Sequence, residues 1–194
     1  MTMLDSSIDR PDINHILHPP PTTLNSMGKN KTSSNGCILP SFLYMASASA
    51  ASSIEFLQRH EITIIISVGK TPSRKYSSIE TGHGPRSIIY HRLGLEDKED
   101  ADITKCVEAA CIILDEASAS NRRVLVHCSA AISRSPAVVA GYLIRRRGHS
   151  LEEALEALRK VRPVVSPNRG FIEQLKGIEM EASERMGRHG EVEG

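Results

Sequence analysis

Residues 127–135 bring together a cysteine and an arginine at a spacing that suits phosphate chemistry. Cys128 and Arg134 are separated by five residues, most of them small or hydroxylated: Ser129, Ala130, Ala131, Ile132 and Ser133. An apolar strand precedes this loop and a helix follows it, so successive backbone N–H groups would turn toward a common centre at the helix start. Such a turn binds oxyanions, and the planar guanidinium of Arg134 would hold two oxygens of a phosphate.

Cys128 is the candidate nucleophile of this loop. A free cysteine has a pKa of about 8.5, and a helix N-terminus together with a guanidinium can lower that value by ~2–4 units. A thiolate beneath a bound phosphate would attack phosphorus and form a cysteinyl-phosphate, which water then cleaves. Cys128 could instead be a buried structural thiol beside a surface arginine. The apolar strand before the loop and the sequence Ser135-Pro136 after it favour the catalytic interpretation.

Strands and helices alternate around this loop. Apolar and β-branched runs predict strands at 37–39, 42–45, 62–68, 87–95 and 124–126. Helical periodicity and capping residues predict helices at 48–60, 103–119, 136–147, 150–160 and 168–185. Gly148 lies just past the end of the third helix, and Ser150 with Glu153 forms a capping box at the start of the fourth. The alternation predicts an α/β fold with a central, mainly parallel sheet flanked by helices. Because such sheets bind ligands at the carboxyl ends of their strands, a site is expected directly after Val126.

The composition limits the function classes. The 194 residues are 40% hydrophobic and 24% charged, and the net charge of +1 provides no overall positive field for nucleic acid or an anionic membrane. Aromatic residues make up 4% without any Trp, which argues against a base-stacking surface. The sequence has no apolar run of membrane-spanning length and no secretory signal pattern at its start. We therefore expect no nucleic-acid or membrane partner, and a cytoplasmic or nuclear location.

The cysteine spacing and the ends of the chain complete the domain prediction. The four cysteines form no C-x-x-C pair, so we expect free thiols and no metal site. Residues 1–35 are rich in Ser, Thr, Asn and Pro without a helical or strand period, which predicts a disordered tail. Residues 36–182 are predicted to form one domain, followed by a flexible C-terminal tail at 183–194.

The stretch from His127 to Ser135 resembles the signature H-C-x-x-G-x-x-R-[ST] of the dual-specificity group of the protein tyrosine phosphatase superfamily. The likeness extends over residues 36–180. Residues 43–48 are similar to that group's L-Y-L-G-S turn, 62–66 to its G-I-T-H-I-I-N strand, and 162–175 to its closing segment. The resemblance implies a protein tyrosine phosphatase-like fold and a cysteine-dependent phosphatase.

The resemblance also implies a role for each residue of the loop. Cys128 would be the nucleophile, and Arg134 would bind phosphate together with the backbone amides of 129–134. Ser135 would donate a hydrogen bond that helps the thiolate leave. His127 would tune the thiolate, or serve as a hydrogen-bonded structural histidine, and both roles are compatible.

The general acid is expected in the acidic loop before the helix at 103–119. Asp97 lies 31 residues before Cys128 and resembles the acid of the family's P-I-E-D run. A carboxylic acid there would protonate the leaving oxygen and then activate water. Asp100 is the second candidate, while Glu96 and Glu99 are expected to be surface charges.

Two further positions bear on the loop. Asn168 resembles the family residue that braces the phosphate loop, although capping of the following helix is an equal alternative. Ala131 departs from the family, which has Gly at that position. A left-handed backbone there would cost about 1–2 kcal/mol for a residue with a Cβ, which would weaken the anion site.

The resemblance implies hydrolysis of phosphotyrosine and phosphoserine or phosphothreonine in protein substrates, a protein kinase among the candidates, without a cofactor. A phosphoinositide or RNA-end phosphatase is an alternative, but such enzymes carry Lys or His in the loop, whereas 129–133 are neutral. A catalytically weak phosphate-binding scaffold is a third interpretation, which Ala131 motivates. No pattern in the sequence predicts an oligomeric state.

Overall fold

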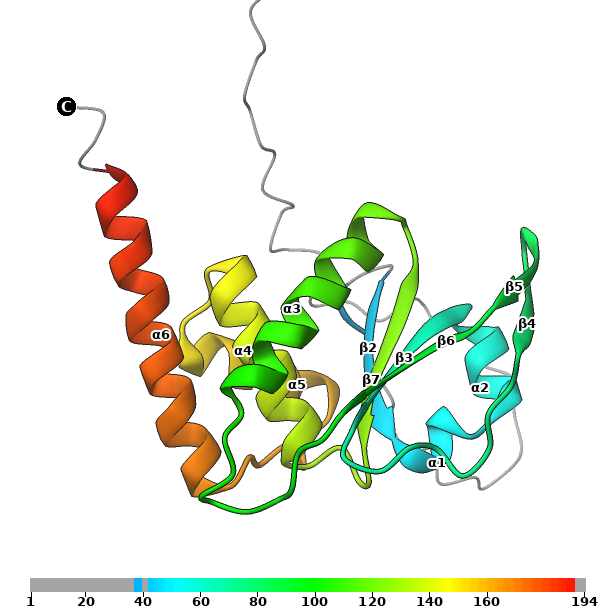
Figure 1. Ribbon diagram of the computed structural model, residues 1–194, viewed down its shortest axis with the longest axis horizontal. Coiled ribbons are helices and arrows are strands. Elements are labelled where there is room, and N and C mark those ends of the chain that lie inside the picture. The colour runs from blue at the N-terminus through cyan, green and yellow to red at the C-terminus, as the bar shows by residue number, and fades with distance from the viewer. Residues whose placement is uncertain (1–36, 40–41, 191–194) are drawn as a thin grey trace, which may run out of the picture.

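The computed structural model of the chain describes residues 37–39 and 42–190. The predicted tail 1–35 lies outside the described residues, as do the last four residues of the predicted tail 183–194. The strands are β1 (Cys37–Leu39), β2 (Leu43–Ser47), β3 (Ile62–Val68), β4 (Ser78–Thr81), β5 (Gly84–Ser87), β6 (Ile89–Leu93) and β7 (Arg123–Cys128). The helices are α1 (Ala48–Ala51), α2 (Ile54–Arg59), α3 (Thr104–Ala119), α4 (Arg134–Arg147), α5 (Leu151–Val161) and α6 (Arg169–Gly190) (Figure 1).

The main sheet has the strand order β1-β2-β7-β3-β6. β7 pairs in parallel with β2 and with β3, and β3 pairs in parallel with β6, whereas β1 runs antiparallel to β2. The prediction of an α/β fold with a central, mainly parallel sheet is therefore confirmed. β7 is the middle strand and Cys128 is its last residue. The predicted phosphate loop thus starts at the carboxyl edge in the middle of the sheet.

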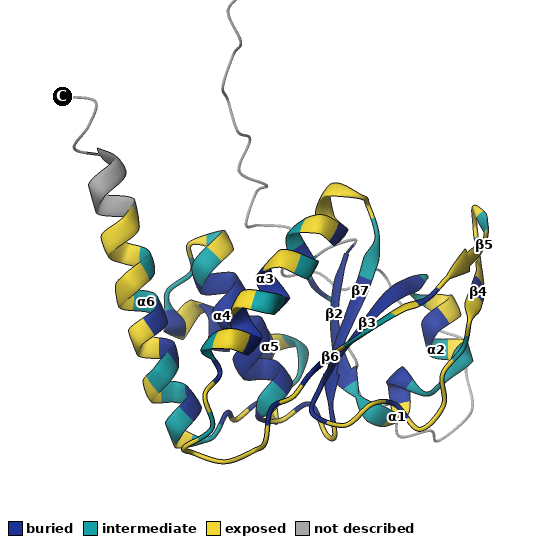
Figure 2. Cartoon of the chain, in the orientation of Figure 1, coloured by how far each residue is buried: buried dark blue, intermediate teal, exposed yellow. Residues whose placement is uncertain are grey.

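Helices cover both faces of this sheet. α3, α4, α5 and α6 lie on one face, and α1 and α2 lie on the other together with the β4–β5 hairpin (Figure 1). Side chains of β7 alternate between the two apolar clusters, with Val124 and Val126 in the larger one and Leu125 in the smaller one. All of β3 is buried, as expected for a parallel strand that is covered on both faces (Figure 2).

Helix α4 follows the loop and forms the buried centre of the helical layer. Its residues from Ser135 to Ile144 are all buried. The helix ends at Gly148, where φ is 68°, a left-handed conformation that glycine adopts without a steric cost. The predicted capping box of Ser150 and Glu153 is also confirmed, and it opens α5. These local signals set both ends of the turn between α4 and α5.

Two predicted elements differ from the structure. The helix expected at 48–60 is divided into α1 and α2, because the Ser53 hydroxyl accepts a hydrogen bond from the Phe56 backbone N–H at 3.2 Å and starts a new helix. The strand expected at 87–95 is β6, and it is preceded by an antiparallel hairpin of β4 and β5 that the sequence did not predict. This hairpin is largely exposed, so it lacks the apolar run that marks the other strands.

Helix α6 is longer than predicted and lies against the acidic loop. It continues to Gly190, past residue 183 where the flexible tail was expected to begin. Gly170 in its first turn packs directly on the backbone of Glu99, whose carbonyl oxygen an added Cβ would overlap. Gln174 adds two hydrogen bonds of 2.9 Å, one from the Ile103 N–H and one to the Ala101 carbonyl. None of the helices in the described part of the chain combines the length and apolar character needed to cross a bilayer.

Substitution of Gly170 tests this close packing. Gly170→Ala should lower the free energy of unfolding by about 1–3 kcal/mol, because its methyl group must push the Glu99 backbone away. Gly177→Ala in the same helix is the matched control, since a Cβ there meets no atom within 4 Å. That change should stabilise the protein by about 0.5–1 kcal/mol through helix propensity. Urea denaturation measures both, and equal effects of the two variants would contradict the proposed packing.

Candidate active site

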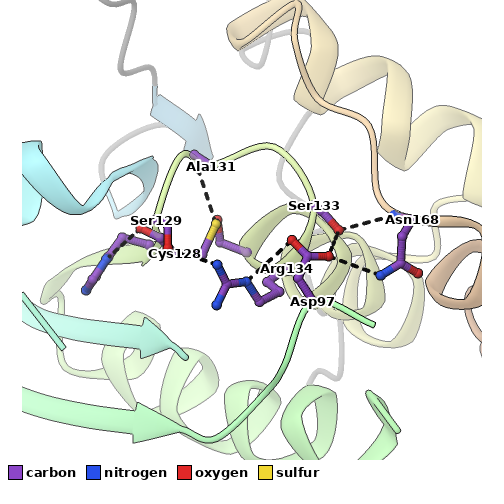
Figure 3. A network of polar contacts seen from close by, with 9 residues as sticks. Asp97, Cys128, Ser129, Ala131, Ser133, Arg134 and Asn168 are labelled. Carbon is purple, nitrogen blue, oxygen red and sulfur yellow. Dashed lines mark hydrogen bonds and ion pairs between the residues drawn. The ribbon is translucent and has the colours of Figure 1, made fainter. Parts of the chain in front are cut away.

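Cys128 lies beneath a turn of backbone N–H groups, where β7 passes into α4. Its sulfur is buried, with the residue 3% exposed, and accepts a hydrogen bond of 3.2 Å from the Ala131 N–H (Figure 3). The Ser135 hydroxyl donates a second hydrogen bond of 3.2 Å to the same sulfur. The loop 129–133 therefore wraps around the sulfur. This is the arrangement of donors that the sequence predicted for an oxyanion.

Hydrogen bonds lower the pKa of the Cys128 thiol. Burial acts in the opposite direction and is the largest single influence, but the donors together outweigh it. They are the Ser135 hydroxyl and the backbone N–H groups of Ser135, Ala131 and Ile132. The sequence attributed the lowered pKa to the helix N-terminus and to Arg134. In the structure, the Ser135 N–H belongs to the first turn of α4, so the helix start does contribute, and the hydroxyl of the same residue and the loop amides lower the pKa further.

Ala131, which stands where the family signature has Gly, adopts a left-handed backbone conformation. Its φ is 53°, which costs about 1–2 kcal/mol for a residue with a Cβ. Its side chain is fully buried in the larger apolar cluster, and a buried methyl group returns about 0.8 kcal/mol. The loop thus accepts alanine with much of the strain offset, and the Ala131 N–H still reaches the sulfur.

The carbonyl groups of the loop point away from the sulfur and are bonded to other segments. Arg162 donates to the carbonyls of Ala130 at 2.8 Å and Ala131 at 3.1 Å. The Ser166 N–H donates to the Ile132 carbonyl at 2.8 Å. The sequence analysis matched Arg162 to the closing segment without giving it a role. The signal that could have identified Arg162 is its position, directly after a predicted helix and a few residues before Asn168.

Arg134 reaches back across the loop from the first position of α4. Its Nη2 donates to the Ser129 hydroxyl at 2.9 Å, and its Nε lies 3.6 Å from Asp97 Oδ2 (Figure 3). That Nε is buried and has no hydrogen-bond acceptor among the described residues. Gly69 allows the guanidinium to lie here, because a Cβ on Gly69 would come within 2.5 Å of Nη1. The sequence analysis did not identify this role of Gly69.

Asp97 lies over the loop and is held by side chains from two segments. Its Oδ1 accepts hydrogen bonds from the Ser133 hydroxyl at 2.6 Å and from Asn168 Nδ2 at 3.1 Å (Figure 3). Asn168 also accepts a hydrogen bond from the Phe171 N–H at 2.9 Å, and its own N–H donates to Ser133 Oγ at 3.2 Å. Both predicted roles of Asn168 are therefore visible in its contacts, since it caps α6 and contacts the loop.

The other carboxylates of the acidic loop face elsewhere. Glu96 forms an ion pair with Lys98. Glu96 and Asp100 line a separate hollow of about 300 Å³ next to Leu95. Among the described residues, Glu96, Glu99 and Asp100 form no hydrogen bond or ion pair with the phosphate loop. The structure thus brings Asp97 to the loop and leaves Asp100, the second candidate, outside it.

His127 is fully buried and links the loop to β3. Its Nδ1 lies 3.1 Å from the Cys128 carbonyl oxygen, and its Nε2 lies 2.9 Å from Ser67 Oγ. Burial lowers the pKa of His127, so the ring is neutral near pH 7. A carbonyl only accepts, so Nδ1 carries the proton and Nε2 accepts from Ser67. The Cys128 carbonyl thereby fixes the tautomer, and Ser67, a residue that the sequence did not point to, supplies the matching donor for Nε2.

The site residues include no metal-binding cluster. Within the described residues, no three His, Cys, Asp or Glu side chains converge in a way that could hold a metal ion. The cysteines at 37, 106, 111 and 128 form no disulfide with one another.

The role of Ser135 can be tested on the thiol itself. Ser135→Ala removes the strongest donor to the sulfur and should raise the pKa of Cys128, so that the thiolate forms only at higher pH. Ser133→Ala is the matched control, because its hydroxyl contacts Asp97 and not the sulfur. The pH dependence of thiol alkylation, compared with Cys128→Ser to subtract the other cysteines, measures the shift. An unchanged profile in Ser135→Ala would contradict the assignment.

Comparison with known proteins places this site in a family. The family described as "Dual specificity phosphatase, catalytic domain" matches residues 43–181. Dual specificity protein phosphatase 1 of Arabidopsis thaliana is 36% identical over 137 residues, which are 71% of this chain and 65% of that protein. Dual specificity protein phosphatase 5 of Rattus norvegicus is 40% identical over 144 residues, which are 74% of this chain and 35% of that protein.

A solved structure gives the same result for the fold. The crystal structure of human DUSP28 is 29% identical to this chain, with a TM-score of 0.66, and the match covers 77% of this chain and 98% of that one. The family match spans the whole sheet from β2 onward, the acidic loop and the phosphate loop. The resemblance drawn from the residues around Cys128 is thereby confirmed, and the chain belongs to the dual specificity phosphatase family.

Proposed function

We propose that this protein hydrolyses phosphate monoesters on tyrosine and on serine or threonine side chains of proteins through a cysteinyl-phosphate intermediate. The observation that carries the proposal is the pairing of a thiol of lowered pKa with a buried guanidinium nitrogen. Cys128 Sγ is enclosed by N–H and hydroxyl donors, and Arg134 Nε has no acceptor among the described residues. An incoming phosphate would supply that acceptor.

In the first step, the Cys128 thiolate attacks phosphorus and the bond from phosphorus to the leaving oxygen breaks. Arg134 and the loop amides hold the equatorial oxygens, where negative charge is present in the transition state. Asp97 gives its proton to the leaving oxygen, which departs as an alcohol or phenol. To do so, Asp97 exchanges its contact with Arg134 for one with the substrate, and its 41% exposed side chain has room for that movement.

In the second step, water attacks the cysteinyl-phosphate. Asp97, now a carboxylate, takes a proton from the water, and the S–P bond breaks to release phosphate and the thiolate. Ser135 stabilises the departing thiolate through the hydrogen bond that it already donates to Sγ at 3.2 Å. The thiolate is ready for the next cycle, so no cofactor is consumed.

The comparisons support protein substrates. The matched relatives are named as dual specificity protein phosphatases, and they give no support to the phosphoinositide or RNA-end alternative. The weak phosphate-binding scaffold is also less well supported, because cysteine, arginine and aspartate all face one another despite Ala131. A phosphorylated protein kinase remains one candidate within the proposed class of phosphoprotein substrates.

Replacement of the nucleophile tests the mechanism. Cys128→Ser should abolish hydrolysis of p-nitrophenyl phosphate, because a serine hydroxyl is far less ionised than this thiol. Arg134→Lys should lower kcat/KM by at least about 10²-fold, since a point ammonium cannot hold two oxygens in the fork geometry. Cys111→Ser is the control, because its buried thiol lies on α3. Assays with a chelator present should give the same rates, and activity in Cys128→Ser would refute the proposal.

The pH–rate profile and a variant of Asp97 test the thiolate and the acid. The lowered pKa of Cys128 means that the rate should rise with pH below the ordinary pKa of a cysteine thiol. Asp97→Asn should lower kcat about 10²–10⁴-fold for poor leaving groups, with a smaller loss for p-nitrophenyl phosphate.

Asp100→Asn is the matched control for the acid, because Asp100 belongs to the same loop but lines the separate hollow. It should retain a nearly normal kcat with both kinds of leaving group. A larger loss in Asp100→Asn than in Asp97→Asn would show that the acid is assigned to the wrong carboxylate.

A further inference from the structure

A second hollow lies at the end of the sheet opposite the phosphate loop. It has a volume of about 370 Å³ and is lined by Glu61, Thr63, Thr81, His83, Arg86, Asn121 and Arg123. These residues come from the starts of β3 and β7, from the residues just before those strands, and from the β4–β5 hairpin (Figure 1). The volume lies within the range of small-ligand sites and holds many water molecules.

The hollow is separate from the active site. Arg123 is the first residue of β7 and Cys128 is its last. Five steps of a strand place the two residues about 16 Å apart. The ribbon in Figure 1 runs from the turn between α3 and β7 at one end to the loop after β7 at the other. A ligand in the hollow would therefore leave Cys128 free to react.

Positive charge in the hollow exceeds negative charge. Arg123 forms an ion pair with Glu61 at 3.3 Å, and the second carboxylate oxygen of Glu61 accepts from the Gly82 N–H at 2.8 Å. Glu61 is thus occupied by partners within the fold. Arg86 forms no hydrogen bond or ion pair with any described residue, and its exposed guanidinium faces the hollow together with His83.

Arg122, which directly precedes Arg123, adds a further uncompensated charge. Its guanidinium donates to Thr63 Oγ1 at 3.2 Å, to the Thr63 carbonyl at 3.0 Å and to the Ser87 carbonyl at 3.1 Å. All three acceptors are neutral. Burial and then the positive charge of Arg86 lower the pKa of Arg122, which shows that the two guanidinium groups repel one another. An anion between them would relieve that repulsion.

We propose that this hollow, the Arg86 cleft, binds the phosphate group of a phosphorylated peptide segment. Arg86 would donate two parallel N–H groups to the phosphate oxygens, while Arg122 and Arg123 supply positive charge around it and the His83 ring offers a further hydrogen-bond donor. Glu61 at the rim disfavours an extended polyanion such as nucleic acid, because each further phosphate would meet a carboxylate. The cleft would thus hold a phosphorylated protein without hydrolysing that phosphate. The proposal goes beyond the proposed activity and does not require Cys128.

The test uses the full chain with Cys128→Ser, so that a peptide carrying one phosphoserine is not consumed. In an amide NMR titration, the phosphopeptide should shift the signals of Gly82, His83 and Asn121 saturably, and the unphosphorylated peptide should not. Arg86→Glu should weaken this response at least about tenfold, since a charge-assisted contact is lost and repulsion is added. Arg86→Gln, which removes the charge and keeps a polar amide, should weaken it as well.

Separate signals distinguish the cleft from the catalytic loop. Amides of 129–135 report phosphopeptide in the active site, and their response should persist in Arg86→Glu. Arg185→Glu makes the same charge change at an exposed position on α6, and it should leave the signals of the cleft and of the catalytic loop unchanged in their response. No saturable shift at Gly82 and His83, or an equal shift in Arg86→Glu, would overturn the proposal. Binding of phosphoinositide-containing vesicles in place of the phosphopeptide would also overturn it.

Discussion

A reactive sulfur buried at the end of a β-strand is the constraint on which the rest of this structure depends. Burial alone would favour the neutral thiol, so the pKa of Cys128 is lowered only because hydrogen-bond donors surround the sulfur. Most of these donors are backbone N–H groups, which converge only if the chain turns sharply through 129–133. The turn then directs its carbonyls outward, where each needs a donor from elsewhere. Arg162 and Ser166, which follow α5, meet that need.

Side-chain hydrogen bonds likewise hold Asp97 against the phosphate loop. Ser133 uses its hydroxyl for Asp97 and also accepts from the Asn168 N–H, so one side chain connects three segments that lie far apart in the sequence. Asn168 starts α6, and Gly170 brings that helix against the backbone of the loop that carries Asp97. The position of Asp97, the proposed general acid, is therefore set by packing between α6 and the acidic loop.

The sequence predicted the parts of this arrangement that local pattern encodes. The apolar strands, the capping box at Ser150 and the glycine end of α4 depend on neighbours a few residues away, and they are where the sequence predicted them. Other contacts of the site join groups that are distant in the chain: Arg162 with a loop carbonyl, Ser67 with the ring of His127, and Gly69 with the guanidinium of Arg134. Residue type alone does not reveal these partners. The β4–β5 hairpin was missed for a different reason, since its exposed strands carry little apolar signal.

Both ends of β7 attract anions, but they do so by different means. At the carboxyl end, positive potential comes from N–H groups and a helix start, and the guanidinium of Arg134 is held by Asp97 and Ser129. At the amino end, Arg122 and Arg123 are held by the carbonyls of Thr63, Ser87 and His60 at the edge of the sheet. A carbonyl oxygen satisfies the hydrogen-bond donors of an arginine without cancelling the charge of the guanidinium. The end of the sheet where arginines bind these carbonyls therefore keeps a positive field. The carboxylate of Glu61 offsets that field only in part. The Arg86 cleft is thus a consequence of how this fold satisfies its own backbone.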